Sequence, residues 1–185
     1  MAQVAPTLIG DGLVLRELRD EDRPALRSIL AEESVARWWG TRTIDESVDD
    51  LYDPDVISWV IEVEGIAAGS IQAREENEPD YRHAGIDLFL AGAYQGRGIG
   101  PAAIRLVVRH LVERRGHHRL TIDPSAANTR AIRAYERVGF KPVGIMRRYE
   151  RGPDGTWHDG LLMDLLAEEL PRAEPAQGPG EEAPG

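Results

Sequence analysis

The sequence predicts an α/β fold, a mixed central β-sheet with helices on both faces. Strand-like runs rich in β-branched residues alternate with amphipathic segments along the chain. A glycine-rich loop at residues 95–100 separates one such strand from one such helix. The 185 residues, 42% hydrophobic and 29% charged, match the composition and size of one globular domain. We place that domain at residues 1–170.

The first elements are a strand, a helix and an aromatic loop. Residues 13–18 carry three leucines after Gly-Asp-Gly and predict a short strand. Residues 20–31 combine an acidic first turn, Pro24 and one apolar face, which predicts a helix. Trp38 and Trp39 follow in a loop or short helix.

Three strands come next. Residues 56–63 and 66–73 are rich in β-branched residues and flank Glu64-Gly65, which predicts a hairpin with a tight turn. The connection over residues 74–82 is acidic, and its Glu75–Asp80 segment either attracts cations or is a solvated charge run. Residues 85–90 alternate, with Asp87 and Phe89 on the face opposite the core-facing positions.

The second half of the chain predicts two helices and three strands. An apolar stripe predicts a helix at 101–115, and Gly139 is typical of the left-handed residue that ends a helix at 128–138. Strands are expected at 120–123, 140–148 and 157–166. Residues 171–185 contain four Pro, three Gly and three Glu, and we expect a disordered tail there.

Composition excludes several classes of function. With 22 basic against 32 acidic residues, the net charge of -10 opposes nucleic-acid or anionic-membrane binding. The absence of Cys excludes a disulfide framework, a thiolate metal site and a cysteine nucleophile. No pair of histidines has a metal-binding spacing with an acidic partner, so we expect no metal, and only His158 is a candidate substrate contact. The sequence shows neither a membrane span nor a secretory signal, so we expect a cytoplasmic location.

The residues Gln95-Gly96-Arg97-Gly98-Ile99-Gly100 open the helix that follows at Pro101. Glycines let successive N–H groups point at one spot, and the helix N-terminus adds partial positive charge, so the loop can bind phosphate. The loop lacks the Gly-Lys-Ser/Thr of a Walker motif and the third glycine of a dinucleotide fingerprint. A flexible glycine turn is the alternative.

Asn128 and Tyr135 form the second signal. Seven positions place them two turns apart, about 10.5 Å along one helix face, so both can touch an elongated ligand. The alternative is structural: Asn128 caps the helix and Tyr135 packs in the core.

Together these stretches resemble the GNAT acyltransferase superfamily, whose Gln/Arg-x-x-Gly-x-Gly/Ala loop matches residues 95–100 and whose Asn...Ala...Tyr...Gly-Phe ending matches residues 128–140. The resemblance implies a GNAT-like fold and acetyl-CoA as cosubstrate. It implies that the loop holds the pyrophosphate, that the backbone at Phe89, Leu90 and Ala91 pairs with pantetheine, that Asn128 touches the pantetheine arm, and that Tyr135 lies near the sulfur.

Within the superfamily, the chain resembles aminoglycoside 6'-N-acetyltransferases most closely, through Trp38-Trp39-Gly40, Gly85-Ile86-Asp87 and Asp123-Pro124-Ser125. This implies direct acetyl transfer in a ternary complex to a primary amine of a small polycation, with the 6'-amino group of an aminoglycoside as the expected acceptor, an activity associated with antibiotic resistance. Siderophore-precursor (hydroxylysine-type) acylation, protein N-terminal acylation and a non-catalytic acyl-CoA sensor are the alternatives. Some relatives pair through their last strands, so a homodimer through residues 140–166 is one possibility.

Each candidate side chain has a chemical role and a structural alternative. Asp87 can orient the substrate ammonium and accept its proton, although an ordinary pKa near 4 would make it a weak base that serves mostly in binding. Asp123 can bind a second amine or shape the turn before Pro124. Tyr135 is the candidate general acid. Of Trp38 and Trp39, we expect one to face the site.

Overall fold

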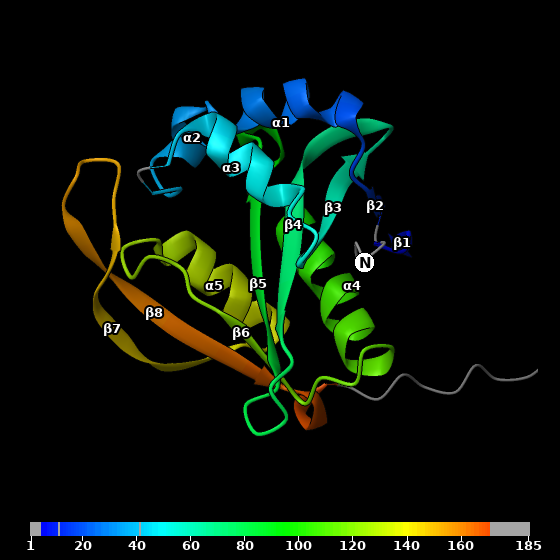
Figure 1. Ribbon diagram of the computed structural model, residues 1–185, viewed down its shortest axis with the longest axis vertical. Coiled ribbons are helices and arrows are strands. Elements are labelled where there is room, and N and C mark those ends of the chain that lie inside the picture. Colours follow the sequence, from blue (N-terminus) through cyan, green and yellow to red (C-terminus); the bar gives the residue numbers. More distant parts are fainter. Residues whose placement is uncertain (1–4, 11, 41, 171–185) are drawn as a thin grey trace, which may run out of the picture.

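The computed structural model describes residues 5–10, 12–40 and 42–170, and the expected tail at 171–185 lies outside them. It contains one eight-stranded sheet with the order β1-β2-β3-β4-β5-β6-β8-β7 (Figure 1). Every neighbouring pair is antiparallel except β5 and β6, so the predicted mixed sheet is confirmed. The strands are β1 (Leu8–Gly10), β2 (Leu13–Glu17), β3 (Val56–Val63), β4 (Ile66–Glu76), β5 (His83–Leu90), β6 (Arg119–Ile122), β7 (Lys141–Arg151) and β8 (Trp157–Leu166).

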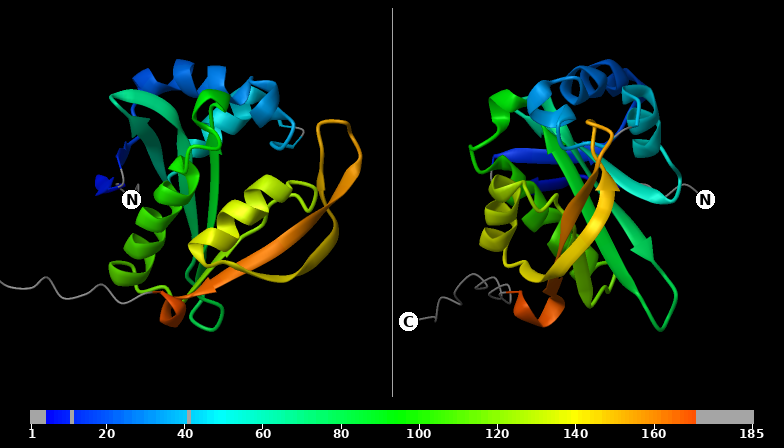
Figure 2. Two further views of the ribbon diagram at one scale, coloured as in Figure 1. Left: turned by 180° about the vertical axis from the view of Figure 1, so that it is seen from behind. Right: turned by 90° about the vertical axis from the view of Figure 1, so that its left-hand side faces the viewer.

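Helices cover both faces of the sheet, as predicted. The helices are α1 (Arg23–Leu30), α2 (Glu33–Ala36), α3 (Ile44–Leu51), α4 (Ile99–Glu113) and α5 (Thr129–Val138). β5 alternates between the two layers: Ile86 packs with α4 in the larger core, whereas Phe89 packs with α1, α2 and α3 in the smaller one. Figure 2 shows α4 and α5 next to each other, and residues of the two helices are in contact.

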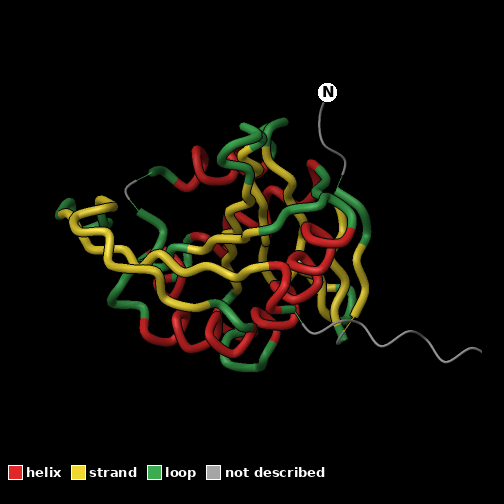
Figure 3. Tube along the Cα trace, turned by 90° about the horizontal axis from the view of Figure 1, so that it is seen from below, coloured by secondary structure: helices red, strands yellow, loops and turns green. Residues whose placement is uncertain are grey.

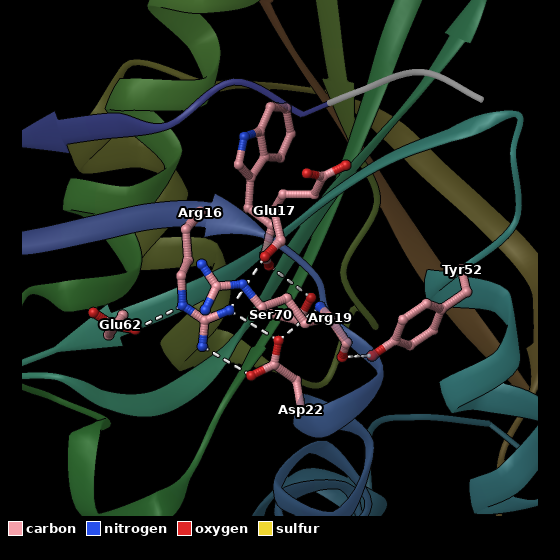
Figure 4. Close-up of polar contacts among 8 residues, drawn as sticks. Arg16, Glu17, Arg19, Asp22, Tyr52, Glu62 and Ser70 are labelled. Atoms are coloured by element: carbon pink, nitrogen blue, oxygen red, sulfur yellow. Dashed lines mark hydrogen bonds and ion pairs between the residues drawn. The ribbon is translucent and has the colours of Figure 1, made fainter. Parts of the chain in front are cut away.

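A polar network fastens the α1 layer to the sheet (Figure 4). The guanidinium of Arg16 donates to both oxygens of Asp22 at 2.8 Å and to Glu62 at 2.7 Å. Asp22 also accepts from the Arg19 amide, whose carbonyl accepts from the Tyr52 hydroxyl. These donors lower the pKa of Asp22, so the carboxylate stays ionised and holds the start of α1 against β2 and β3.

The structure differs from the sequence prediction at three elements, the first of which is β1, a strand with no predicted counterpart. The prediction omitted α3, although Thr43 and Glu46 form a reciprocal capping box at its start. It also ended the fourth strand too early, because β4 continues to Glu76. As a result the Glu75 side chain is 2% exposed. Its carboxylate accepts from Arg115 Nε at 2.9 Å and pairs with His117 Nε2 at 2.7 Å, which ties β4 to the segment between α4 and β6. The idea that Glu75 attracts cations is therefore wrong.

Candidate active site

The site forms where the sheet splits between β5 and β6. These parallel strands pair only at Ala84 with Leu120 and Gly85 with Thr121, although β5 continues to Leu90. Beyond the split, the Ala91 amide donates to the carbonyl of Ala68 on the β4 side at 2.9 Å. Because strand residues alternate, the main-chain groups of Leu88 and Leu90 face the split instead.

This alternation refines the predicted pantetheine contacts. Of Phe89, Leu90 and Ala91, the main chain of Leu90 faces the split, and its carbonyl accepts from Gln95 Nε2 at 2.7 Å. Phe89 and Ala91 are buried in the smaller core, and their main chains belong to the β4 side. An extended ligand in the split would therefore hydrogen bond to the main-chain groups of Leu88 and Leu90.

The glycine loop presents bare amides at the start of α4. Gly96 and Gly98 adopt left-handed φ values of 76° and 81°, and Gly98 is the residue that caps α4. No heavy atom lies within 4 Å of the position that a Cβ would take at either glycine, so the loop surface is open. In the described part of the chain, the N–H groups of Gly96, Arg97 and Gly98 meet no acceptor. Open amides at the N-terminus of a 15-residue helix are a site for an anion such as a diphosphate.

The remaining loop residues hold the loop in place. Gln95 bridges two elements, because its side chain also accepts a hydrogen bond from Arg130 of α5. The Arg97 guanidinium lies over the Tyr94 ring at 5.5 Å. Ile99 packs against the larger core, and a Cβ at Gly100 would lie 3.5 Å from Leu90 Cδ1 and 3.8 Å from Leu88 Cδ1.

A cavity of about 780 Å³ runs from this loop past α5 to the strand ends. Its size is typical of a small-molecule site. It gathers predicted residues from segments far apart in the sequence. The lining includes Trp38, Trp39, Asp87, Phe89, Leu90, Gln95, Gly96, Gly98, Gly100, Asp123, Asn128 and Tyr135, but not Ala91, Arg97 or Ile99.

Asp87 is the most perturbed carboxyl of the cavity. Enclosure by protein, and after it the charges of Asp123 and Glu150, raise its pKa to about 7. Solvent still reaches the side chain through the open cavity, and the carboxylate accepts from the Leu88 amide at 2.8 Å. The expectation of an ordinary pKa near 4 is therefore wrong, because the sequence shows neither the enclosure of Asp87 nor its two neighbouring carboxylates.

β7 supplies residues that the sequence analysis missed. Tyr149 and Glu150 reach the region of Asp87 and Asp123 from the outermost strand. The neighbouring Asp123 carboxylate and, after it, burial raise the pKa of the Tyr149 hydroxyl to about 12. Burial and the charge of Asp123 raise the pKa of Glu150. No local motif marks these two residues, since only the sheet order β6-β8-β7 brings them there.

Asn128 and Tyr135 each have a structural role and also line the cavity, so both interpretations of the sequence apply to them. Asn128 Oδ1 caps α5 by accepting from the Ala131 amide at 3.2 Å, and the residue also lines the cavity. Tyr135 packs against the larger core and lines the cavity. Burial, followed by the charges of Asp87 and Asp123, holds the pKa of the Tyr135 hydroxyl well above its usual value of 10. The hydroxyl therefore keeps its proton and can donate it in a hydrogen bond.

The two tryptophans differ in packing. Trp39 meets Phe89 edge-on, with ring centroids 5.0 Å apart, and helps to cover the smaller core. Trp38 and Trp39 both line the cavity.

His158 lies 2.9 Å from the carboxylate of Asp154 at the tip of the β7–β8 hairpin. No cluster of three or more metal-ligating side chains occurs within the described residues, and none of their helices is long and apolar enough to span a membrane.

Comparisons with known proteins agree with this geometry. The chain is 30% identical over 164 residues to aminoglycoside N(6')-acetyltransferase type 1 of Klebsiella pneumoniae, covering 78% of this chain and 80% of the relative. It is 27% identical over 159 residues to spermidine N(1)-acetyltransferase of Escherichia coli, covering 82% and 84%.

Among solved structures, Mycobacterium smegmatis RimJ in complex with CoA-disulfide superposes with a TM-score of 0.79 at 25% identity, covering 93% of this chain and 91% of that one. AAC(6')-Ib in complex with ribostamycin and coenzyme A gives a TM-score of 0.72 at 26% identity, with 90% and 99% covered. Residues 12–141 match the acetyltransferase (GNAT) domain. The chain therefore belongs to the GNAT acetyltransferase family and is an N-acetyltransferase that uses acetyl-CoA.

Proposed function

We propose that this enzyme acetylates a primary amine of a small polycation, with the 6'-amino group of an aminoglycoside as the first candidate. The observation that carries the proposal is the convergence of Asp87, Asp123 and Glu150 in the cavity that starts at the anion-binding loop. One end of the cavity thus suits the diphosphate of coenzyme A, and the other suits ammonium groups.

The volume and aromatic lining of the cavity favour a small cationic molecule over a protein substrate. Trp38, Trp39 and Trp157 line it, and indole faces attract cations and stack on sugar rings. A protein N-terminus would need an extended groove. Hydroxylysine-type siderophore precursors fit the volume but carry fewer positive charges to match three carboxylates.

The chemistry follows from the two perturbed side chains. Bound acetyl-CoA supplies an acyl thioester within reach of the amine. With its pKa near 7, Asp87 is partly ionised at neutral pH, so it can hold an ammonium group and accept its proton. Tyr135 keeps its proton and can donate it to the departing sulfur. The acetyl group then passes directly from the sulfur to the amine in a ternary complex, because Asp87 takes the proton from the attacking amine while Tyr135 gives one to the departing sulfur.

The relatives support a polycationic substrate but leave two substrate classes, aminoglycosides and linear polyamines. Those compared include acetyltransferases named for an aminoglycoside and for spermidine, both of which carry several amines. We place the aminoglycoside first because its named acetyltransferase has the higher identity, and a linear polyamine second. If the first holds, expression in a susceptible host raises the inhibitory concentration of a 6'-amino aminoglycoside.

Thiol release from acetyl-CoA tests the proposal with an aminoglycoside, spermidine, hydroxylysine and a peptide as acceptors. We expect the two polycations to be preferred, and Asp123→Asn or Glu150→Gln to raise their KM. The matched control is Glu78→Gln, which removes an exposed carboxylate outside the cavity lining. Preference for hydroxylysine or peptide would refute the polycation assignment, and binding of acetyl-CoA without turnover of any amine would indicate a sensor.

For the oligomeric state, we propose a homodimer through residues 140–166. β7 is one of the two edge strands of the sheet and lies in the hairpin that projects at the left of Figure 3. Its Val143 and Ile145 are exposed, and an exposed edge of this kind favours pairing. Analytical ultracentrifugation tests it, and a monomer at micromolar concentration would refute it.

A further inference from the structure

The β7–β8 ladder is interrupted beside the acidic end of the cavity. Three residues of β7, 147–149, stand opposite one residue of β8, Asp159. In the bulge, Arg148 has a φ of 51°, and Glu64 of the β3–β4 turn is the other non-glycine residue with positive φ among those described. The Arg148 amide donates to Asp159 Oδ1 at 2.8 Å. A bulky residue in this conformation is strained, so the surrounding contacts must hold it there.

Asp159 holds a second segment through its main chain. Its carbonyl accepts from the Ala126 amide at 2.8 Å, and the Leu161 amide donates to Pro124 at 2.9 Å. The segment that follows β6 is thereby fixed along one edge of β8, while the bulge of β7 is fixed along the other. Asp159 is therefore the point at which both segments meet.

Side chains of the β7 bulge and of the segment that follows β6 also lie close together. Glu150 lines the same cavity as Asp123 and Ser125, and Ser125 bridges to Gly160 of β8. Tyr149 of the bulge lies near enough to Asp123 for that carboxylate to raise the pKa of its hydroxyl. The Tyr149 ring lies close to the β8 backbone, because a Cβ at Gly160 would come within 2.9 Å of its Cδ1. A bulge bends its strand and re-aims the side chains around it, and here it aims them at the candidate amine site.

We propose that Asp159 is a positioning residue that sets the affinity for the substrate amine: it fixes the β7 bulge so that Tyr149 and Glu150 stand against Asp123 and Ser125. Asp159 is absent from the cavity lining and acts through Arg148. The part of this inference that concerns amine affinity rests on the proposed function, whereas the placement of Tyr149 does not.

Steady-state kinetics test the effect on affinity with Asp159→Ala, Asp159→Asn and the control Asp164→Ala. Loss of a hydrogen bond to a charged acceptor should raise the KM for the polycationic amine about tenfold in Asp159→Ala, while the KM for acetyl-CoA stays unchanged. Asp159→Asn keeps an acceptor oxygen and should restore the KM. Asp164 is on the same strand but pairs with Arg119, so its loss should not change the KM. Equal loss in the Ala and Asn variants would overturn the proposal.

A titration of Tyr149 gives a readout that needs no activity. In ¹³C-tyrosine-labelled protein, with Tyr149→Phe to assign the signal, we expect a pKa near 12 in the wild type and a value nearer 10 in Asp159→Ala. If no amine is acetylated, the proposed function fails but this titration still decides the placement. Should Asp159→Ala fail to fold, Gly160→Ala displaces the same ring from β8 and should lower the same pKa. An unchanged Tyr149 pKa would overturn the proposal.

Discussion

Replacing Asp87 with Asn should remove a pH-dependent step from the reaction. A carboxyl with a pKa of about 7 is about 10% ionised at pH 6 and about 90% ionised at pH 8. If the ionised form accepts the ammonium proton, its contribution to kcat/KM rises about ninefold over that interval. A carboxyl at its ordinary 3.8 would be fully ionised throughout and would contribute no change.

The assay is thiol release from acetyl-CoA between pH 5.5 and pH 9, with one polycationic amine for both proteins. Asp87→Asn should lower kcat/KM by about 100-fold or more near pH 8, which is the range for loss of a general base. Because the amine is the same, its own protonation cancels in the ratio of wild type to variant. That ratio should rise about ninefold from pH 6 to pH 8. A ratio that is constant over this range would refute the role of Asp87 as a base.

Two further measurements isolate the cause of the shift. Asp123→Asn should move the break in the profile to lower pH, because the Asp123 charge is the second contribution after burial. Stability should also respond. Since folding raises the Asp87 pKa from 3.8 to about 7, the wild type loses stability relative to Asp87→Asn as the pH rises through that window. Thermal unfolding should show the difference opening between pH 4 and pH 7 and staying constant above it.

The remaining predictions concern the loop, the candidate acid and the buried carboxylate. Gly98→Ala should weaken acetyl-CoA binding about fivefold by calorimetry, because a Cβ at φ 81° costs about 1 kcal/mol and the loop would relax away from the geometry that aims its amides at the diphosphate. Gly65→Ala, at φ 77° in a remote turn, should cost stability alone. Tyr135→Phe should lower kcat about 100-fold or more with little change in acetyl-CoA affinity, and unchanged kcat would remove it from the mechanism. Glu75→Gln should lower the free energy of unfolding by about 3 kcal/mol at pH 7 and leave KM unchanged. Because its folded pKa is about 2, the stability that Glu75 contributes is lost as pH falls from 4.5 toward 2, and equal denaturation midpoints at pH 7 would contradict this.

The sequence predicted what local chemistry determines. Glu64-Gly65 forms the expected tight turn, with both residues at positive φ, and Gly139 ends α5 at φ 119°. The 95–100 loop opens a helix as expected, because its glycines and Pro101 are local signals. The capping box of Thr43 and Glu46 is also local and would have revealed α3.

The sequence could not predict what depends on pairing across the sheet. Glu150 enters the cavity lining, with Tyr149 beside it, through a bulge that the β8 partner defines, and no residue near them in sequence indicates it. The main-chain groups that face the split depend on the register between β4 and β5. The shifted pKa of Asp87 likewise depends on its burial in the fold and on Asp123, which follows β6, and Glu150 of β7.

Two carboxylates show why net charge does not locate a cation site. Glu75 belongs to the acidic stretch that composition singles out, yet Arg115 and His117 donate to it, and they lower its pKa to about 2. Its charge is already matched inside the protein. Asp87 is isolated in sequence, but burial and then the like charges of Asp123 and Glu150 raise its pKa to about 7. An arriving ammonium group would relieve that repulsion, so the unmatched carboxylate rather than the acidic run is where a polycation gains binding energy.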